Sequence, residues 1–245
     1  MPTEPEITFP LYAADLTTTA QFADTGKCMI CSQHAVVCFR LGIGTAIICT
    51  CASCGEQTAL ASVGGGAEDA FCVRCEQALA INALPADPVA CGTCLRAGKV
   101  AITKDTEFGM VRWEDAMAGR THGVPGHLTT GGLPTAPTED DWTSVLVDPA
   151  ILLDLVRTPT YNTWQGEQWL FCCRHPMVYI GEWSQPDLGQ HSDDDLTTTF
   201  MAVFDDAEPW VLQFMPANPT QDADWGFYVF RCRLCDKVRG HFDMT

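Results

Sequence analysis

The 245-residue chain is 47% hydrophobic, which is enough apolar material for a core and argues against global disorder. Its net charge of −17 disfavours binding to the phosphate backbones of nucleic acids and favours basic partners. The first residues, MPTEPEITFP, do not resemble a signal peptide, and no apolar run approaches the ~18 residues of a membrane-spanning helix. We therefore expect a cytoplasmic protein of one large domain or two smaller ones that does not enter a membrane.

Residues 1–118 are predicted to form a cysteine-rich domain. After a short apolar stretch, ITFPLY, the segment 34–49 (HAVVCFRLGIGTAIIC) is rich in β-branched and apolar residues around a central glycine, a pattern that predicts a hairpin. The segment 72–84 (CVRCEQALAINAL) changes to helical spacing, so we expect a short helix that begins at its two cysteines.

Residues 119–141 contain Gly, Pro and Thr with few apolar side chains, which predicts a linker or a long loop. A helix is expected over residues 148–159, because Asp148 is a good N-cap, Pro149 suits the first helical position and Pro159 follows the end. The strand candidates that follow are QWLFCC (168–173), MVYIGEW (177–183), TTTFMAVF (197–204), WVLQFMP (210–216) and GFYVFRC (226–232). The predicted fold class is therefore α+β, with a zinc-ribbon-like N-terminal region joined to a mainly antiparallel β domain over residues 142–245.

Ten of the fourteen cysteines fall into five Cys-x-x-Cys pairs, of which four lie in the N-terminal region. Two thiolates at this spacing sit on one turn and face one ion, and a second turn completes a tetrahedral site. The spacers between the first four pairs are 19, 17 and 15 residues, within the ~15–20 typical of zinc sites. Without an export signal, zinc is favoured over disulfides. Two four-cysteine zinc sites are predicted, with the ligands Cys28, Cys31, Cys51, Cys54, Cys72, Cys75, Cys91 and Cys94. Spacing alone leaves sequential, nested and interleaved pairings open.

The fifth pair, Cys232 and Cys235, requires partners for a third zinc site. The only other suitable group is FCCRHP, which offers Cys172, Cys173 and His175. The third site is therefore predicted to contain either three cysteines and one histidine or four cysteines. Cys38 and Cys49 lie in apolar strand segments and are expected to be core residues.

The acidity is concentrated in one part of the chain. Residues 119–230 contain sixteen acidic residues against three Lys or Arg, a balance of −13. Two clusters stand out, and they comprise Asp193, Asp194 and Asp195, and Asp205, Asp206 and Glu208 beside Trp210. They are either solvated turns that serve solubility or a binding face for a basic protein.

Recognisable catalytic motifs are absent from the sequence. It contains no His-Glu-x-x-His, no phosphate-binding loop and no nucleophile elbow. Five cysteine pairs at mutual ligand spacing also favour metal over thiol redox chemistry. We therefore predict a non-enzymatic protein. A zinc-ribbon module that binds nucleic acid or acts in regulation is the alternative, with RCRLCDKVRGH (231–241) as the only basic cluster.

The C-terminal half resembles the CbrC-like family of bacterial colicin-tolerance proteins. The resemblance is carried by RTPTYNTWQGEQWLFCC, PMVYIGEW and YVFRCRLCDKVRGHFD, in which the matching positions are Arg157, Thr158, Pro159, Trp164, Gln165, Glu167, Trp169, Leu170, Cys173, Gly181, Cys232, Cys235, Lys237 and Arg239. The N-terminal match is thinner and consists of FPLY (9–12), the first cysteine pair and CLRAGKVAITKDTEF (94–108). The chain departs from the family at Met177, where the family often has a further cysteine.

The resemblance implies a nested pairing of the N-terminal cysteines. CMIC and CGTC would be the family's two N-terminal pairs, and residues 50–76 would be an inserted zinc finger with its own two pairs. At the C-terminal site, the resemblance implies that Cys172 or His175 replaces the missing ligand. It also implies tolerance or immunity to a bacterial toxin. A toxin domain that cuts nucleic acid is basic, so it would suit an acidic partner protein.

Overall fold

The computed structural model describes residues 8–35, 37–42, 44–60, 71–79, 87–126, 132–138, 141–205, 207–218 and 224–245. The elements up to residue 118 are η1 (Leu16–Thr18), β1 (Gly26–Lys27), β2 (His34–Ala35), β3 (Cys38–Arg40), β4 (Thr45–Thr50), β5 (Gln57–Leu60), β6 (Val89–Cys91), α1 (Gly92–Arg96), β7 (Val100–Ile102) and α2 (Trp113–Ala118). The elements after it are β8 (Val124–Pro125), β9 (Thr135–Pro137), β10 (Trp142–Val145), α3 (Pro149–Val156), β11 (Phe171–Cys172), β12 (His175–Pro176), β13 (Val178–Glu182), α4 (Gln185–His191), α5 (Leu196–Val203), η3 (Pro209–Phe214), β14 (Trp225–Arg231) and β15 (Val238–Met244). Helices and antiparallel sheets together confirm the α+β class.

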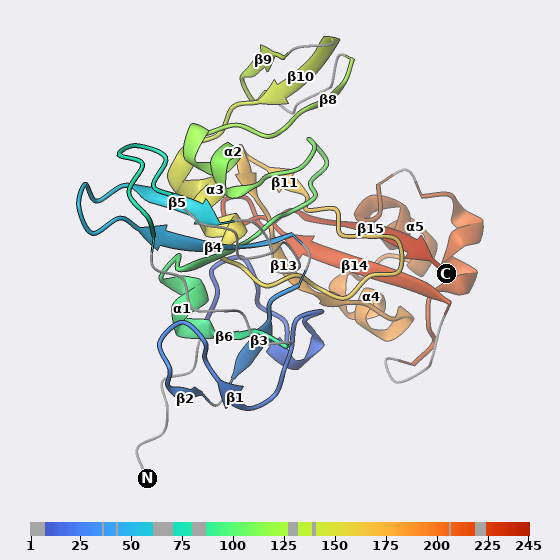
Figure 1. Ribbon diagram of the computed structural model, residues 1–245. Coiled ribbons are helices and arrows are strands. Elements are labelled where there is room, and N and C mark those ends of the chain that lie inside the picture. The colour runs from blue at the N-terminus through green and yellow to red at the C-terminus, as the bar shows by residue number, and fades with distance from the viewer. Residues whose placement is uncertain are drawn as a thin grey trace.

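An antiparallel sheet of β13, β14 and β15 lies between two apolar clusters. Strand β14 is buried from Gly226 to Phe230, because its side chains alternate between two covered faces. Tyr228 and Phe230 belong to the larger cluster, while Phe227 and Val229 belong to the smaller one under α4, α5 and η3. Figure 1 shows these helical segments beside the sheet, at the right of the molecule. We call residues 185–218 with the adjoining sheet face the C-terminal lobe.

The contact between α5 and this sheet depends on a glycine. A Cβ atom at Gly240 of β15 would lie 2.6 Å from the ring of Phe204, which follows α5. Phe204 therefore occupies the space that any other residue at position 240 would fill. The close approach packs the end of α5 against β14 and β15, the two strands that flank Cys232 and Cys235.

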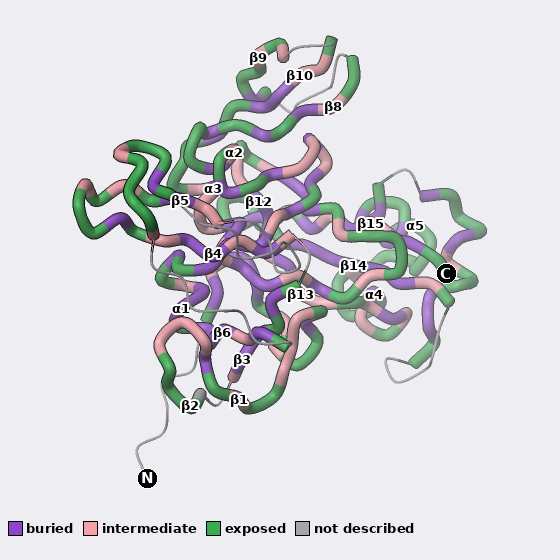
Figure 2. Tube along the Cα trace, viewed as in Figure 1, coloured by how far each residue is buried: buried purple, intermediate pink, exposed green. Residues whose placement is uncertain are grey.

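The larger apolar cluster joins the N-terminal and C-terminal parts of the chain. Phe39 and Leu95 are buried in the same cluster as Leu152, Trp169 and Phe230. Figure 2 shows the buried segments gathered at the centre, with exposed segments at the edges. The first and last cysteine pairs are therefore attached to one shared core. Among the described residues, no helix has the length and apolarity needed to cross a membrane.

The expected helix after Asp148 is present, and the Asp148 side chain accepts a hydrogen bond from the N–H of Ala150 at 2.8 Å. Two of the expected strands are wrong, because TTTFMAVF lies in α5 and WVLQFMP lies in η3. In α5, Asp195 caps the N-terminus, and the buried residues Thr199, Phe200 and Val203 recur at helical spacing. The strand prediction rested on the β-branched threonines. Their β propensity contributes less than a helix cap and an apolar helix face, so the segment forms a helix.

Three further expectations differ from the structure. The segment 34–49 does not form one hairpin, because β3 pairs with β6 and β4 pairs with β5 and β7. The segment expected as a linker contributes β8 and β9, which flank β10 in a small sheet at the top of Figure 1. Residues 72–79 form a turn and a bridge rather than a helix, and the rest of that expected helix lies outside the described residues.

Candidate metal centres

Four of the five cysteine pairs occupy turns of the same geometry. The turns join β1 to β2, β4 to β5, Phe71 to its bridge partner Ala78, and β14 to β15. In each turn the N–H of the first cysteine donates to the carbonyl five residues later, as from Cys28 to Gln33 at 2.9 Å. The N–H that follows the second cysteine donates back to the first cysteine's carbonyl. The same bonds begin at Cys51, Cys72 and Cys232.

The residue after the second cysteine of these four turns has a positive φ. The values are 60° at Ser32, 75° at Gly55, 57° at Glu76 and 57° at Asp236. A left-handed residue at this point reverses the chain, so that both thiols of the pair face the same side of the turn. Only one of the four is glycine, which is why the shared geometry is not visible as a sequence motif.

The remaining pair, Cys91 and Cys94, lies at the start of helix α1. Cys91 is the N-cap residue and Cys94 lies within the first turn, so that residues three apart share one face of the helix. The backbone N–H of Cys91 donates to the Sγ of Cys28 at 3.3 Å, which connects α1 to the β1–β2 turn. The local sequence thus directs the thiols of α1 towards the first cysteine turn.

The structure brings twelve cysteines together in three clusters of four, whose sulfur atoms lie within 4.8 Å of one another. The first cluster comprises Cys28, Cys31, Cys91 and Cys94; the second comprises Cys51, Cys54, Cys72 and Cys75; the third comprises Cys172, Cys173, Cys232 and Cys235. The first Cys-x-x-Cys pair therefore meets the fourth, and the second meets the third, which is the nested pairing. Figure 1 shows the two turns of the second cluster side by side at the left edge, at the far end of β4 and β5.

The sulfur separations match those of a tetrahedral zinc site. A Zn–S bond of ~2.3 Å gives a tetrahedron with S–S edges of ~3.8 Å, whereas a disulfide measures ~2.05 Å. Across the first cluster, Cys28 and Cys94 are 3.8 Å apart, as are Cys31 and Cys91. The corresponding edges in the second cluster are 3.5 Å, and Cys172 lies 3.6 Å from Cys235 in the third. These edges, together with the 4.8 Å limit on all the other sulfur separations, fit a metal site with four thiolate ligands in each cluster.

The third cluster uses two adjacent cysteines. Strands β11 and β12 form a two-residue hairpin in which Cys172 pairs with His175, while Cys173 and Arg174 have φ values of 51° and 67°. Two positive φ values in succession are typical of a type I′ turn, which brings the thiol of Cys173 to the same side as that of Cys172. His175 does not join the cluster, because its Nδ1 lies 2.9 Å from the carbonyl oxygen of Cys173. Of the two ligand sets expected from the sequence, the cluster therefore has the four-cysteine set and not the set with His175.

Backbone N–H groups favour a thiolate in every cluster. The N–H of Cys54 is the largest of the contributions that lower the pKa of Cys51 to about 6. Burial raises the pKa of Cys28, but backbone N–H groups outweigh it and lower that pKa to about 7. The N–H of Lys237 lowers the pKa of Cys235 to about 7. The neighbouring cysteines Cys94, Cys75 and Cys172 have raised thiol pKa values, so the backbone favours the metal-binding thiolate form at selected cysteines of each cluster and not at all four.

The two remaining cysteines behave differently. Cys38 is fully buried beside the first cluster, and burial raises the pKa of its thiol. Cys49 is half-buried on β4, and burial raises its thiol pKa as well. A raised pKa keeps both thiols neutral, and neither cysteine belongs to a cluster of the described residues.

The described acidic residues that were predicted to bind a partner lie on the C-terminal lobe, but several have structural roles. Asp195 accepts hydrogen bonds from the N–H groups of Thr197 and Thr198, and Asp205 forms an ion pair with Arg239. Asp193 is exposed, and Asp194 accepts a hydrogen bond from Ser192. Glu208 accepts from the indole N–H of Trp210 at 2.6 Å, and Asp206 lies outside the described residues.

Arg239 makes a junction that the sequence did not reveal. Its guanidinium contacts Glu107 at 3.0 and 3.2 Å, the carbonyl of Phe171 at 2.6 Å, and Asp205. Glu107 also accepts the N–H of Phe171 at 2.6 Å. These bonds hold β11 against β15 directly beside the third cluster. The sequence around Arg239 gives no indication of these partners, because they lie far away in the chain.

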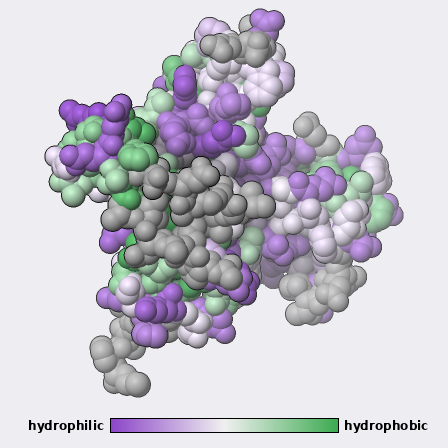
Figure 3. Space-filling model, in the orientation of Figure 1, coloured by the Kyte–Doolittle hydropathy of each residue, from purple (hydrophilic) through white to green (hydrophobic). Residues whose placement is uncertain are grey.

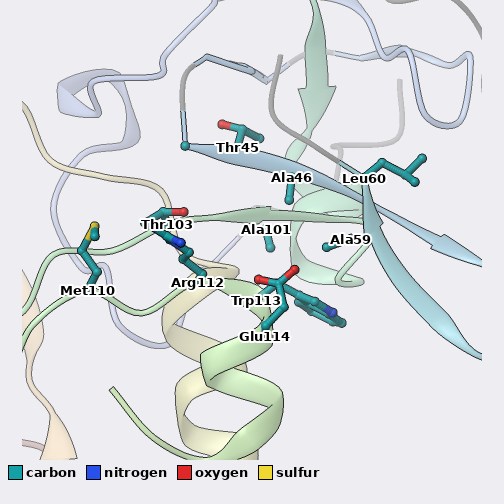
Figure 4. A pocket seen from close by; sticks show the side chains of 11 residues that line it. Thr45, Ala46, Ala59, Leu60, Ala101, Thr103, Met110, Arg112, Trp113 and Glu114 are labelled. Carbon is teal, nitrogen blue, oxygen red and sulfur yellow. The ribbon is translucent and has the colours of Figure 1, made fainter. Parts of the chain in front are cut away.

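A cleft of about 380 Å³, one of several hollows among the described residues, lies between the sheet of β4, β5 and β7 and the start of α2. Figure 4 shows Ala46, Ala59 and Ala101 on the sheet, opposite Trp113 and Glu114. Small side chains create the hollow, and none of the lining residues is His, Cys, Asp or Lys. The ionisable side chains of the described lining are Glu114 and Arg112, which do not form a set of metal ligands.

Comparison with known proteins identifies the family of the chain. No solved structure matches it. A protein of Pseudomonas aeruginosa, UPF0167 protein PA1536, is 29% identical over 105 residues, which is 41% of this chain. The chain spans 58% of the length of that relative. The resemblance to CbrC-like proteins remains a prediction, since the matched names are those of UPF0167. The pattern of the uncharacterised protein family UPF0167 matches residues 40–244, so the chain belongs to this family.

Proposed function

We propose that this protein is a non-enzymatic binding protein, stabilised by three zinc ions, that docks a basic partner protein in the cytoplasm. The observation that carries the zinc binding in this proposal is the set of three four-cysteine clusters, whose sulfur atoms lie within 4.8 Å of one another, with several pairs 3.5–3.8 Å apart. Twelve free thiols held at metal-binding distances suit a reducing compartment, where zinc rather than disulfides stabilises a fold.

The ligand sets support structural rather than catalytic metal. A catalytic zinc keeps one position open for water or substrate, while four protein thiolates fill a tetrahedral shell. Each cluster supplies four thiols from the chain itself. Zinc bound there would tie turns together, with Cys28, Cys91 and Cys94 of the first cluster inside the shared core.

The charge of the C-terminal lobe supports a basic partner. Residues 185–218 of this lobe contain seven Asp or Glu and no Lys or Arg. Such a single-sign surface accelerates encounters with a positively charged protein and repels nucleic acid. On the lobe, the turn of Asp193, Asp194 and Asp195 borders a groove together with Gln185 and Ala217.

Exposed aromatic rings on the same lobe, next to Glu208, would supply contact area. Trp210 is 52% exposed and Phe214 is 39% exposed. Trp210 meets Phe214 edge-on at 5.9 Å, and Phe214 stacks on Trp225 at 4.7 Å. The hydrogen bond to Glu208 fixes the indole further. Figure 3 shows hydrophobic surface on this lobe, bordered by hydrophilic surface. Fixed, exposed Trp residues are typical of binding hot spots.

Tolerance or immunity to a bacterial toxin is the biological role we propose for this binding. The resemblance of the C-terminal half to colicin-tolerance proteins motivates it, and the acidic lobe adds an independent reason. A toxin domain that cuts nucleic acid has a basic surface, because it must hold phosphate groups. An acidic lobe with aromatic anchors suits such a surface.

The test is capture of partners from cells of the source strain, followed by association kinetics with the purified partner at ~50 and ~300 mM salt, since screening shortens the reach of surface charge. The variant Asp193→Asn/Asp194→Asn should reduce the on-rate several-fold at low salt only. Trp210→Ala should mainly raise the off-rate. Asp87→Asn/Glu114→Gln removes two exposed charges elsewhere and is the matched control.

Two results would contradict the proposal. One is an acidic partner, or a rate that is indifferent to salt and to the lobe variants. The other is tight, salt-sensitive binding to DNA that is lost on changing Arg231 and Arg233, which would favour the nucleic-acid alternative.

A further inference from the structure

The third cluster differs from the other two in how it is covered. Cys232 is 2% exposed and belongs to the larger apolar cluster, but Cys173 and Cys235 are both exposed and Cys172 is half-buried. Leu234, at the tip of the same turn, is 62% exposed. One side of this cluster therefore faces solvent.

In the first cluster the cysteines are far better shielded. Three of its four cysteines are buried, Cys28 completely, and all three lie inside the larger apolar cluster. An external chelator would have to open the core to reach an ion there. This cluster is therefore the least accessible of the three.

The second cluster is the competing candidate for an accessible site. It lies at the end of β4 and β5 and belongs to neither apolar cluster. Its own turns nevertheless cover it, because Cys51 and Cys72 are 4% and 1% exposed and the other two cysteines are half-buried. None of its cysteines is exposed, whereas two are exposed in the third cluster.

We propose that the third cluster is an exchangeable metal site, which releases and takes up zinc under conditions in which the other two clusters retain theirs. The inference rests on the zinc binding of the proposed function and goes beyond it, because it assigns a separate role to one site. Ligand exchange begins when an incoming thiol or chelator approaches the ion from an open side. Cys173 and Cys235 form that side.

Reversible exchange also requires a site that keeps its shape without metal. Arg239 donates to the carbonyl of Phe171 at 2.6 Å, and Glu107 accepts both the N–H of Phe171 and the guanidinium of Arg239. Phe171 itself is buried. These contacts hold the Cys172–Cys173 turn beside the Cys232–Cys235 turn independently of any ion. The emptied cluster would therefore remain assembled and ready to bind again.

The experiment uses the full chain loaded with zinc. A chelator is added, released zinc is followed with a chromogenic indicator, and samples are pulsed with N-ethylmaleimide so that peptide mapping identifies the exposed thiols. One zinc per chain should leave at least about tenfold faster than the others, because accessible thiolates react first. The first alkylated peptides should contain Cys172, Cys173 and Cys235. Zinc added after removal of the chelator should restore the original count.

Variants assign the fast phase to the cluster. Cys173→Ser and Cys235→Ser should abolish that phase and leave the two slow ions unchanged. Cys49→Ser, which changes a half-buried cysteine outside the clusters, is the matched control and should keep all three ions. Arg239→Met should leave the zinc-loaded protein folded but slow the uptake of zinc by the emptied site several-fold, because the two turns are no longer held together.

Three results would overturn the inference: release of all ions in one phase, a fast phase that maps to Cys51, Cys54, Cys72 and Cys75, or a fast release that added zinc cannot reverse. The labelling of the unmodified protein decides the first two even if a variant fails to fold. A protein that takes up no zinc at all would contradict the proposed function instead, so the two failures are distinguishable.

Discussion

Loss of one ligand should have very different consequences in the first and second clusters. Cys91 belongs to the apolar cluster that joins both parts of the chain, together with Cys28 and Cys94. Cys75 belongs to a cluster that lies outside both apolar clusters. Cys91→Ser and Cys75→Ser are therefore chemically identical changes that test the same bond in two contexts.

The expected magnitudes follow from this placement. A structural zinc site contributes ~10–16 kcal/mol apparent, while a whole domain has a net stability of only ~5–15 kcal/mol. Cys91→Ser removes that contribution from the shared core and should leave little folded protein. Cys75→Ser should disorder the end of the β4–β5 hairpin but change global stability by only ~1 kcal/mol, the scale of a local contact.

Circular dichroism during thermal unfolding, with zinc content measured on the same samples, separates the two cases. Cys75→Ser should retain two zinc ions and a cooperative transition near that of the unmodified protein. Cys91→Ser should lose the transition, and the fluorescence of the buried Trp169 should shift towards that of a solvated indole. Equal effects of the two variants on the transition would refute the reasoning, because the second cluster would then support the core as well.

Three further predictions concern single contacts. Burial lowers the pKa of His241 to about 4, so the free energy of unfolding should fall by about 1.3 kcal/mol between about pH 7.5 and about pH 5.5. In urea unfolding, His241→Asn should lack this pH-dependent loss, and the same pH dependence in the variant would contradict the prediction. The Nζ of the fully buried Lys104 lies 3.5 Å from the Glu167 carboxylate, so Glu167→Leu alone should lower the free energy of unfolding by ~3–5 kcal/mol. Adding Lys104→Met should restore most of this loss in a double-mutant cycle, whereas additive losses would exclude coupling between the two residues. Asp195→Ala should cost ~1 kcal/mol in thermal unfolding through loss of the α5 cap, whereas Asp193→Ala should cost almost nothing; equal losses would contradict the cap.

The sequence predicted the residues of the clusters better than the elements that carry them. The Cys-x-x-Cys spacing is a local signal, because both thiols of a pair sit on one turn. The order in which the pairs meet depends on strands far apart in sequence, such as the pairing of Cys38 in β3 with Cys91 in β6. Spacing carries no information about such contacts, and only the resemblance favoured the nested order.

The errors share a physical origin. Thr197, Thr198 and Thr199 favour strands by intrinsic propensity, but the Asp195 cap and the buried Phe200 favour the helix that forms. His175 was a plausible ligand by type, yet the tight turn at Cys173 presents the second thiol instead. Tertiary context overrides local preference where a short segment is compatible with two structures.

Zinc content combined with X-ray absorption spectroscopy tests the central claim most directly. The account predicts three zinc ions per chain, each bound by four sulfur atoms at ~2.3 Å, with no open position for water. Fewer than two zinc ions per chain, or a first shell dominated by nitrogen or oxygen, would contradict it.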